Sequence, residues 1–406
     1  MIRTVLRLPG YLTVLFPFLL LLGGAVCDVA ISLTAVLFLV HSYVEKDWGW
    51  TKELWVRCLC LLWVYMMARG LLAEHPLEAE SRSVPFIRYA VFAAALAYWT
   101  LRDELVRKYF FKALAVFVLF VACDGLLQWG TGKDLLRHPS LFYDDHTRLT
   151  GPFRSQILGA MLVWLAFPAC MQFMQCREGR LSVDYRFLLA PLVLAVIALS
   201  GERMALMLAL FGIAIALIVL PVRRVYLLAG VAAGFALVGA VLLASPELFQ
   251  RQVFTTIDTF RNWQSSPYGE LLSSDIQIAG VNPVFGIGTN HFRIVCQEIF
   301  PTASTRCNLH PHNIYMEWLI EQGIIGIGLF LAFIAALAIK CRKNWQGVKN
   351  NPVCVGLLVA VVLRLWPFAS STGIFSRWGS PPFWLIIGVF LMYVTTPSNE
   401  KSENRP

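Results

Sequence analysis

Apolar runs alternate with short polar connections along almost the whole chain. A helix needs about 20 apolar residues to cross a bilayer, because each residue advances it by about 1.5 Å. The pattern therefore predicts about twelve membrane-spanning helices. The runs lie at 10–26, 29–45, 54–73, 86–101, 110–130, 156–176, 187–200, 203–221, 225–245, 313–339, 352–369 and 382–396.

Two junctions between neighbouring runs are narrow. The first two runs meet around Cys27-Asp28, and the seventh and eighth meet at Ser200-Gly201-Glu202-Arg203. If either pair formed one long helix, every later segment would change sides of the membrane. No secretory cleavage site is evident and the first run continues into the second, so we interpret it as a retained span.

One polar segment, 246–312, is long enough for an extramembrane subdomain. Helical patterns around 249–262 and 269–280 predict that it is mainly helical. Its stretch 282–290 is rich in proline and glycine, which favours a tight backbone turn beside a ligand. The expected organisation is nine spans in 1–245, the 246–312 segment, three spans in 313–396 and a cytosolic tail in 397–406.

Composition supports a membrane protein. Of the 406 residues, 58% are hydrophobic and 15% are charged, and the mean hydropathy is +0.64. Soluble domains contain about 45–50% apolar and about 25% charged residues. We therefore predict an all-α polytopic integral membrane protein, with membrane lipids and no nucleic acid among its partners.

Basic residues indicate the orientation, because loops rich in Lys and Arg stay in the cytosol. With the N-terminus in the cytosol, four cytosolic loops hold thirteen basic residues, the acidic segment 73–85 lies outside, and both termini are cytosolic. The basic loop residues are Arg102, Arg107, Lys108, Lys112, Arg177, Arg180, Arg186, Arg223, Arg224, Lys340, Arg342, Lys343 and Lys349.

The opposite side keeps its basic charge almost wholly as arginine, with Lys133 as the exception. A planar guanidinium binds phosphate oxygens through two parallel hydrogen bonds. We therefore predict an outward-facing site for a phosphorylated lipid, although single arginines can instead pair with headgroups or carboxylates. The set is Arg69, Arg82, Arg88, Arg137, Arg148, Arg154, Arg203, Arg251, Arg261, Arg293 and Arg306.

The sequence His310-Pro311-His312-Asn313 stands where the chain returns to the membrane. Asn308 and Asn313 are possible N-caps of the tenth span, and the start of a helix favours an anion. A histidine there can act as a general base with a near-neutral pKa, or donate a hydrogen bond to phosphate. The alternative is an interfacial loop with a few hydrogen-bonding side chains.

Two carboxylates follow on one face of the predicted helix, Glu317 and Glu321. Carboxylates at membrane depth need partners. Arg364 in the eleventh span and Arg203 at the start of the eighth are the expected cations. Structural pairing is the expected role of Glu321.

Two outward turns carry further candidates. The turn Ser200-Gly201-Glu202-Arg203 starts a helix, so two spans hold Arg203 in a fixed place that suits phosphate binding. An ion pair with Glu202 or a neighbouring residue is the alternative. The second turn places Arg148 and Arg154 around a Gly-Pro pair.

The spacing of cysteine and histidine residues bears on two further features, a disulfide and a metal site. Cys296 and Cys307 lie in the 246–312 segment, where an oxidising exterior would allow a disulfide ahead of His310. His310 and His312 are two positions apart and share no helix face, so we expect no metal site. No cofactor is expected.

Together these features resemble the O-antigen ligase family, within a superfamily shared with O-antigen polymerases and bacterial protein O-oligosaccharyltransferases. The number of helices and one large late loop extend the likeness over nearly the whole chain. The resembling residues are Arg148-Leu149-Thr150-Gly151-Pro152-Phe153, Ser200-Gly201-Glu202-Arg203, Pro283, Gly286-Ile287-Gly288, Phe292, His312-Asn313, Glu321 and Gly323.

The resemblance implies a C-type-glycosyltransferase-like enzyme that is metal-independent and inverting. It would transfer polysaccharide from undecaprenyl diphosphate to a hydroxyl of lipid A–core oligosaccharide, on the periplasmic face of the bacterial inner membrane. His312 would deprotonate or orient that hydroxyl, with His310 left open as the alternative, and Arg203 would bind the diphosphate, since arginines can stabilise its charge in place of a metal. The substrate-binding candidates are Arg293, Arg261, Arg154, Arg148, His310, Arg88 and Asn313, and the structural candidates are Glu317, Glu321, Arg364, Cys296 and Cys307.

Other functions remain open on the sequence. A polymerase of the same superfamily would use the same base and arginines with a glycan acceptor. Protein glycosyltransferases of the superfamily usually carry a longer C-terminal region than Asn399–Pro406. A lipid or solute transporter would explain twelve spans, but transporters usually show internal repeats and binding residues at the midplane. A membrane scaffold does not explain His312, Arg203 and Arg293 on one side.

Overall fold

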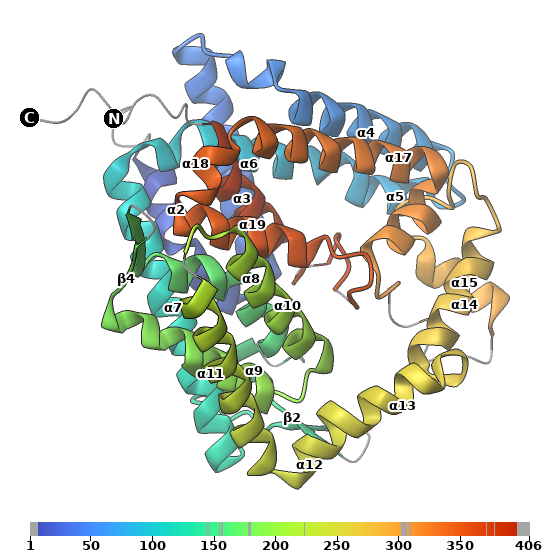
Figure 1. Cartoon of the computed structure of the whole chain (residues 1–406). Helices are drawn as coiled ribbons and strands as arrows, with labels where there is room; N and C mark the ends of the chain where they lie inside the picture. The colour runs from blue at the N-terminus through green and yellow to red at the C-terminus, as the bar shows by residue number, and fades with distance from the viewer. Residues whose placement is uncertain are drawn as a thin grey trace, which may run out of the picture.

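The computed structural model describes residues 7–143, 146–153, 155, 157–177, 180–222, 224–301, 307, 310–370, 372–376 and 378–395. Most of these residues are helical (Figure 1). The helices are α2 (Leu8–Leu19), α3 (Gly24–Val44), α4 (Leu54–Leu71), α5 (Pro76–Ser83), α6 (Ile87–Tyr98), α7 (Glu104–Thr131), α8 (Leu158–Met171), α9 (Leu189–Leu199), α10 (Arg203–Val219), α11 (Arg224–Leu243), α12 (Pro246–Phe249), α13 (Thr255–Arg261), α14 (Pro267–Ala279), α15 (Phe292–Ile299), α17 (Ile314–Lys343), α18 (Trp345–Lys349), α19 (Pro352–Arg364) and α20 (Ser380–Thr395).

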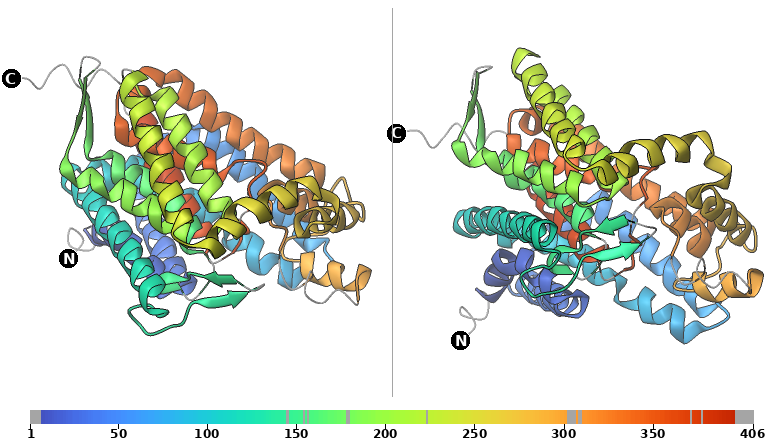
Figure 2. Two further views of the ribbon diagram at one scale, coloured as in Figure 1. Left: turned by 60° about the horizontal axis from the view of Figure 1, so that its bottom comes forward. Right: turned by 90° about the horizontal axis from the view of Figure 1, so that it is seen from below.

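Short elements complete the chain. Two antiparallel hairpins pair β1 (Leu141–Tyr143) with β2 (His146–Arg148), and β3 (Met174–Arg177) with β4 (Arg180–Val183). Figure 2 shows these hairpins well apart on the helical body. The 3₁₀ turns are Leu20–Leu22, Gly49–Lys52, Val84–Phe86, Thr100–Arg102, Gly151–Phe153, Tyr185–Leu188 and Trp263–Ser265, and Gln250–Phe254 is a π-helical turn.

The prediction of an all-α membrane protein is confirmed, whereas the count of twelve spans stays a prediction. Every predicted apolar run contains a helix. By length and composition, five helical stretches of the described chain can cross a membrane, and a sixth if a pair bent by 118° is one span. The five are Gly24–Val44, Leu54–Leu71, Pro76–Arg102, Glu104–Thr131 and Ile314–Lys343. Six further apolar helices have 10–17 residues and are shorter than the approximately 30 Å hydrocarbon core.

Both narrow junctions separate two helices. The first break falls at Gly23 (φ 96°), not around Cys27-Asp28 as the sequence suggested, because glycine reaches positive φ without steric cost. Asp28 therefore lies inside α3. The second break falls at Gly201 (φ 74°), between α9 and α10, as expected.

The core is built from close helix pairs. α17 lies along α4, α20 packs on α6, and α19 packs on α8 (Figure 1). Residues 89–97 of α6 are buried on every side. Small side chains permit this approach, since a Cβ added at Gly388 of α20 would stand 2.7 Å from Leu96 Cδ1 and 3.0 Å from Ala93 Cα.

Two contacts between connections agree with the predicted topology. At one end of the helical body, Lys340 Nζ lies 2.6 Å from Glu53 Oε2, and both residues are predicted cytosolic. At the other end, the hydroxyls of Ser83 and Thr289 lie 2.9 Å apart, and both residues are predicted external. The connections that the sequence assigns to one side therefore meet in space.

The 246–312 segment is mainly helical over its described part, as predicted. After a bend of 118°, α12 and the π-helical turn lead into α13, α14 and α15. Figure 1 shows these helices running from α12, beside α9 and α11, across to the first turn of α17. The segment thus connects two parts of the helical body.

Candidate functional site

The start of α17 is fixed by Asn313. Its Oδ1 accepts hydrogen bonds from the backbone N–H groups of Tyr315 (2.9 Å) and Met316 (3.2 Å), and its Nδ2 donates to the carbonyl of Pro367 (2.6 Å). Asn313 is therefore the N-cap, as the sequence allowed, and its carboxamide is occupied by the protein. Asn308, the other predicted cap, lies outside the described residues.

His310 and His312 stand directly before this cap, with ring centroids 4.8 Å apart. Both are half-buried. Within the described chain, His312 has no hydrogen-bond or ion-pair partner, and its only contact with another ring is with that of His310. Burial lowers the pKa of His312 below the ordinary value of 6.5. Its imidazole is therefore neutral at pH 7 and can accept a proton.

The connection between α19 and α20 lies against this region. Glu317 Oε2 accepts from the backbone N–H of Ile374 (2.7 Å), and Tyr315 Oη donates to the carbonyl of Leu365 (2.6 Å). A Cβ added at Gly373 would stand 2.6 Å from Glu317 Oε1 and 3.2 Å from His310 Cδ2. The connection therefore lies against both the carboxylate and a histidine.

Of the two glutamates of α17, Glu317 has one of the predicted cations, Arg364, as its neighbour, whereas Glu321 has neither of them. Arg364 is 1% exposed, donates to the carbonyl of Thr372 (2.9 Å), and interacts with Glu317 through its charge. Glu321 faces the backbone N–H of Asn290 and the charge of Arg82. Neither Arg203 nor Arg364 forms an ion pair with Glu321 in the described part of the chain, so that expectation is wrong. The reason is that Glu321 lies a full turn deeper than Glu317 and faces α5.

The glycine-rich turn at 282–290 packs against a break in α17. α17 is broken at Gly323 (φ 64°), and the backbone groups released there bond to residues 283–288. Ile324 N–H donates to the Pro283 carbonyl (2.9 Å), and Gly288 N–H donates to the Glu321 carbonyl (2.9 Å). A tight turn was predicted, but it packs against the broken helix where we had expected a ligand.

Two side chains from α4 hold this joint. Tyr65 Oη contacts the carbonyl oxygens of Phe285 (3.1 Å) and Gln322 (2.9 Å). Arg69 Nε donates to the Gly286 carbonyl (2.9 Å). Local sequence pattern does not indicate these contacts, because all three acceptors are backbone carbonyls far away in the chain.

Arg203 reaches out from the start of α10 to the 246–312 segment. Its Nη1 donates to the Thr255 carbonyl (3.0 Å) and to Thr259 Oγ1 (2.9 Å), and its guanidinium lies 5.8 Å from the ring centroid of Tyr268. The alternative of an ion pair with Glu202 is wrong. The Glu202 carboxylate instead accepts the N–H groups of Gly159 (2.7 Å) and Ala160 (3.1 Å), and so caps α8.

Arg251 is a buried arginine that the sequence placed among the external arginines but not among the substrate-binding candidates. It is 5% exposed, and its Nε donates to the Gly201 carbonyl (2.7 Å). Burial raises the pKa of Glu202 to about 7, and the charges of Arg148 and Arg251 oppose this shift. Arg148 and Arg251 thus surround the turn that carries Arg203. Sequence could not single out Arg251 among the external arginines, because burial depends on the bend after α11.

The other arginine candidates are scattered. Arg88 is ion-paired with Asp28 (2.8 Å), inside α3. Arg261 of α13 and Arg293 of α15 are exposed. Arg154 lies outside the described residues. The protein supplies Arg88 with its counter-charge, which argues against a role for it in binding phosphate.

Cys296 of α15 and Cys307 form a disulfide, with an S–S distance of 2.04 Å. It closes the stretch immediately before His310. In the part of the chain that the structure describes, no cluster of three His, Cys, Asp or Glu side chains could hold a metal ion.

No described contact joins His312 to Arg203. The 246–312 segment links them instead, because α13 binds Arg203 while the 283–288 turn binds α17. Several of the predicted site residues therefore form two groups at the two attachments of one segment. The histidines stand at the second attachment, and Arg203, Arg148 and Arg251 at the first.

The fold and these groups define a polytopic, largely helical membrane protein with polar chemistry gathered at helix ends. A family model described as O-antigen ligase matches residues 188–331. The resemblance to the O-antigen ligase family is thereby confirmed over a stretch that contains Arg203, the 246–312 segment, His312 and Gly323. No curated protein matches the chain. Members of that family are glycosyltransferase-like enzymes that act on lipid-linked polysaccharides.

Proposed function

We propose that the protein is an O-antigen ligase of the bacterial inner membrane. It transfers polysaccharide from undecaprenyl diphosphate to a hydroxyl of lipid A–core oligosaccharide on the periplasmic face. The observation that carries this proposal is His312. It is half-buried at the start of α17 with its pKa lowered, and the described protein offers its ring no hydrogen-bond partner.

In the proposed reaction, His312 accepts the proton of the acceptor hydroxyl. The oxygen forms a bond to the anomeric carbon of the first donor sugar, while the bond from that carbon to the diphosphate oxygen breaks, with inversion. The electron pair leaves with undecaprenyl diphosphate, whose developing charge Arg203 stabilises. The protonated imidazole then releases its proton to water.

Rigidity supports Arg203 as the diphosphate ligand. Its two hydrogen bonds to α13 fix one side of the guanidinium, so less side-chain freedom is lost when phosphate binds. Arg148, Arg154, Arg261, Arg293 and His310 are proposed as further contacts. The scheme needs no metal, so activity should survive exhaustive chelation, and loss that added metal restores would overturn it.

The proposed placement follows from the charge pattern. The 246–312 segment and the histidines adjoin the start of α17, whereas Lys340, which pairs with Glu53, lies in the last turn of the same 30-residue helix. Lysine-rich loops remain in the cytosol. Both termini and the lysine-rich loops are therefore proposed to be cytosolic, with the site on the other face.

Complementation of a ligase-deficient Gram-negative host with a matched lipid A–core tests the reaction. The wild type is expected to restore polymer-bearing lipopolysaccharide. A change only in the chain length of lipid-linked polymer, with none on the core, would show a polymerase instead. Accumulation of neither product, with the protein present in the membrane, would contradict both.

A further inference from the structure

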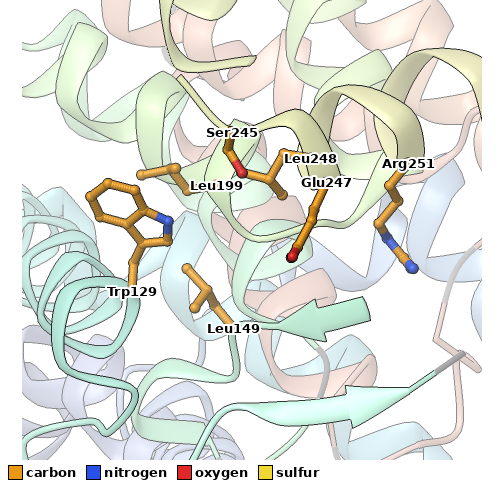
Figure 3. A pocket seen from close by; sticks show the side chains of 7 residues that line it. All are labelled: Trp129, Leu149, Leu199, Ser245, Glu247, Leu248 and Arg251. Carbon is orange, nitrogen blue, oxygen red and sulfur yellow. The ribbon is translucent and has the colours of Figure 1, made fainter. Parts of the chain in front are cut away.

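A cavity of about 180 Å³ lies beside the turn that carries Arg203, at the bend between α11 and α12. Figure 3 shows Trp129, Leu149 and Leu199 on one side of it. Glu247, Leu248 and Arg251 approach from α12 and the turn that follows, together with Ser245. The proposed transfer reaction uses none of the apolar residues of this cavity.

The cavity lies at the level where apolar helices end. Trp129 is in the last turn of α7, Leu199 is the last residue of α9, and Ser245 follows α11. Tryptophan is enriched at the boundary between hydrocarbon and headgroups, because its ring is apolar and its N–H is polar. The cavity therefore faces the depth at which phospholipid headgroups lie.

Charges of opposite sign stand together in the lining. Arg251 is 5% exposed and is held by its bond to the Gly201 carbonyl. Glu247 is exposed in the first turn of α12, and no described residue pairs with its carboxylate. A purely anionic head would meet repulsion from Glu247. A head with both an ammonium and a phosphate would meet a complement for each charge.

We propose that this cavity binds a phospholipid whose head carries a primary ammonium and a phosphate. The ammonium lies at Glu247, the phosphate at Arg251, and the first part of an acyl chain against Trp129 and Leu199. Because Arg251 is bonded to Gly201, an occupied cavity stabilises the turn that carries Arg203. This site is separate from the proposed transfer reaction and does not depend on it.

Native mass spectrometry of the full-length protein tests the proposal. The protein is reconstituted in vesicles of equal phosphatidylethanolamine and phosphatidylglycerol, released, and its retained lipids are counted. The wild type should retain phosphatidylethanolamine in about tenfold preference, the factor that one charge-assisted hydrogen bond supplies. Glu247→Gln should abolish the preference. Glu298→Gln removes the same charge from an exposed position of α15 and should leave it intact.

A second variant separates the lipid site from folding. Arg251→Lys keeps the charge but loses the bidentate geometry, so total phospholipid retention should fall severalfold while the vesicle-reconstituted protein stays intact. Equal retention of both lipids by the wild type would overturn the proposal. So would an unchanged preference in Glu247→Gln, or a polyprenyl diphosphate retained in place of phosphatidylethanolamine.

Discussion

The two attachments of the 246–312 segment are made by different chemistry. At the first, the side chains of Arg203 and Arg251 donate to backbone carbonyls across the junction. At the second, the 283–288 turn and the broken helix α17 exchange backbone hydrogen bonds, and glycines allow the approach. The first attachment therefore gathers two positively charged side chains at the junction. The second holds the start of α17 in place.

This difference predicts different responses to substitution. A charged side chain can lose its bidentate geometry while the fold persists. Where two backbone segments pack directly on each other, an added side-chain atom clashes with main-chain atoms. Those atoms cannot move aside as a side chain can. Glycine variants in the backbone joint of the second attachment should thus fail as folded proteins, and Arg203 variants at the first should fail as enzymes.

Gly323→Ala should have the largest effect. Its Cβ would overlap the carbonyl oxygen of Val284, and its φ of 64° disfavours any side chain. We expect loss of transfer activity and a destabilisation of more than about 3 kcal/mol. Gly328→Ala is the matched control, because nothing lies within 4 Å of its added Cβ in the same helix. Equal thermal unfolding of the two purified variants would break the comparison.

Arg203→Lys should lower the rate of transfer about a hundredfold with little change in thermal stability, because a point charge does not replace a bidentate donor. Arg57→Lys makes the same change at an exposed position of α4, outside the proposed site, and should leave the rate nearly unchanged. Assays of lipopolysaccharide formation at matched membrane expression compare the two. Full activity of Arg203→Lys would remove Arg203 from the site.

Asp275 lies between the two attachments, on α14, which packs against α17. Burial raises the pKa of its carboxyl from 3.8 to about 7. The folded protein thus binds a proton that the unfolded chain releases, so the stability gained at low pH is lost as the pH rises from about 4 through 7. Asp275→Asn should therefore stabilise the protein at pH 8 by about 2 kcal/mol, half the limit of about 4 kcal/mol that the shift sets.

The thermal midpoints of wild type and Asp275→Asn, compared at pH 5 and pH 8, check this prediction. The gain should be larger at pH 8. A gain that is the same at both pH values would mean that Asp275 is not protonated in the folded protein.

Tyr65→Phe should have the smallest effect. It removes the hydroxyl that contacts the carbonyls of Phe285 and Gln322, and one neutral hydrogen bond contributes about 1 kcal/mol. The thermal midpoint should fall by a few degrees, with a modest loss of activity. Tyr11→Phe, at an exposed position of α2, should leave both unchanged. Identical behaviour of the two variants would show that Tyr65 does not secure the joint.

The sequence predicted the features that depend on neighbouring residues in the chain. Apolar runs located every long helix, Gly201 marked a real break, and Asn313 was recognised as a cap. The prediction failed where the hydrogen-bond partner is backbone far away in the chain. The Glu202 carboxylate caps α8, and the glycine turn fills the break in α17, so neither feature follows from local pattern.

The candidate site was predicted in part for the same reason. His312 and Arg203 stand out as polar residues at helix ends, and the matched family segment contains both. Arg251 and the connection that carries Gly373 could not be selected, since their importance depends on burial and on contacts made by folding. Arg88 was selected only for its side of the membrane, and its partner Asp28 lies in a helix whose start was misplaced.

Transfer of polysaccharide by purified protein, measured from about pH 4.5 to 8, tests the central claim most directly. The wild-type rate should rise with pH and level off below 6.5, because burial lowers the pKa of His312 and only the neutral ring accepts a proton. His312→Ala should lose at least a hundredfold in rate together with that pH dependence. His310→Ala should keep the pH dependence. A His312→Ala variant with the wild-type rate and pH profile would contradict the account.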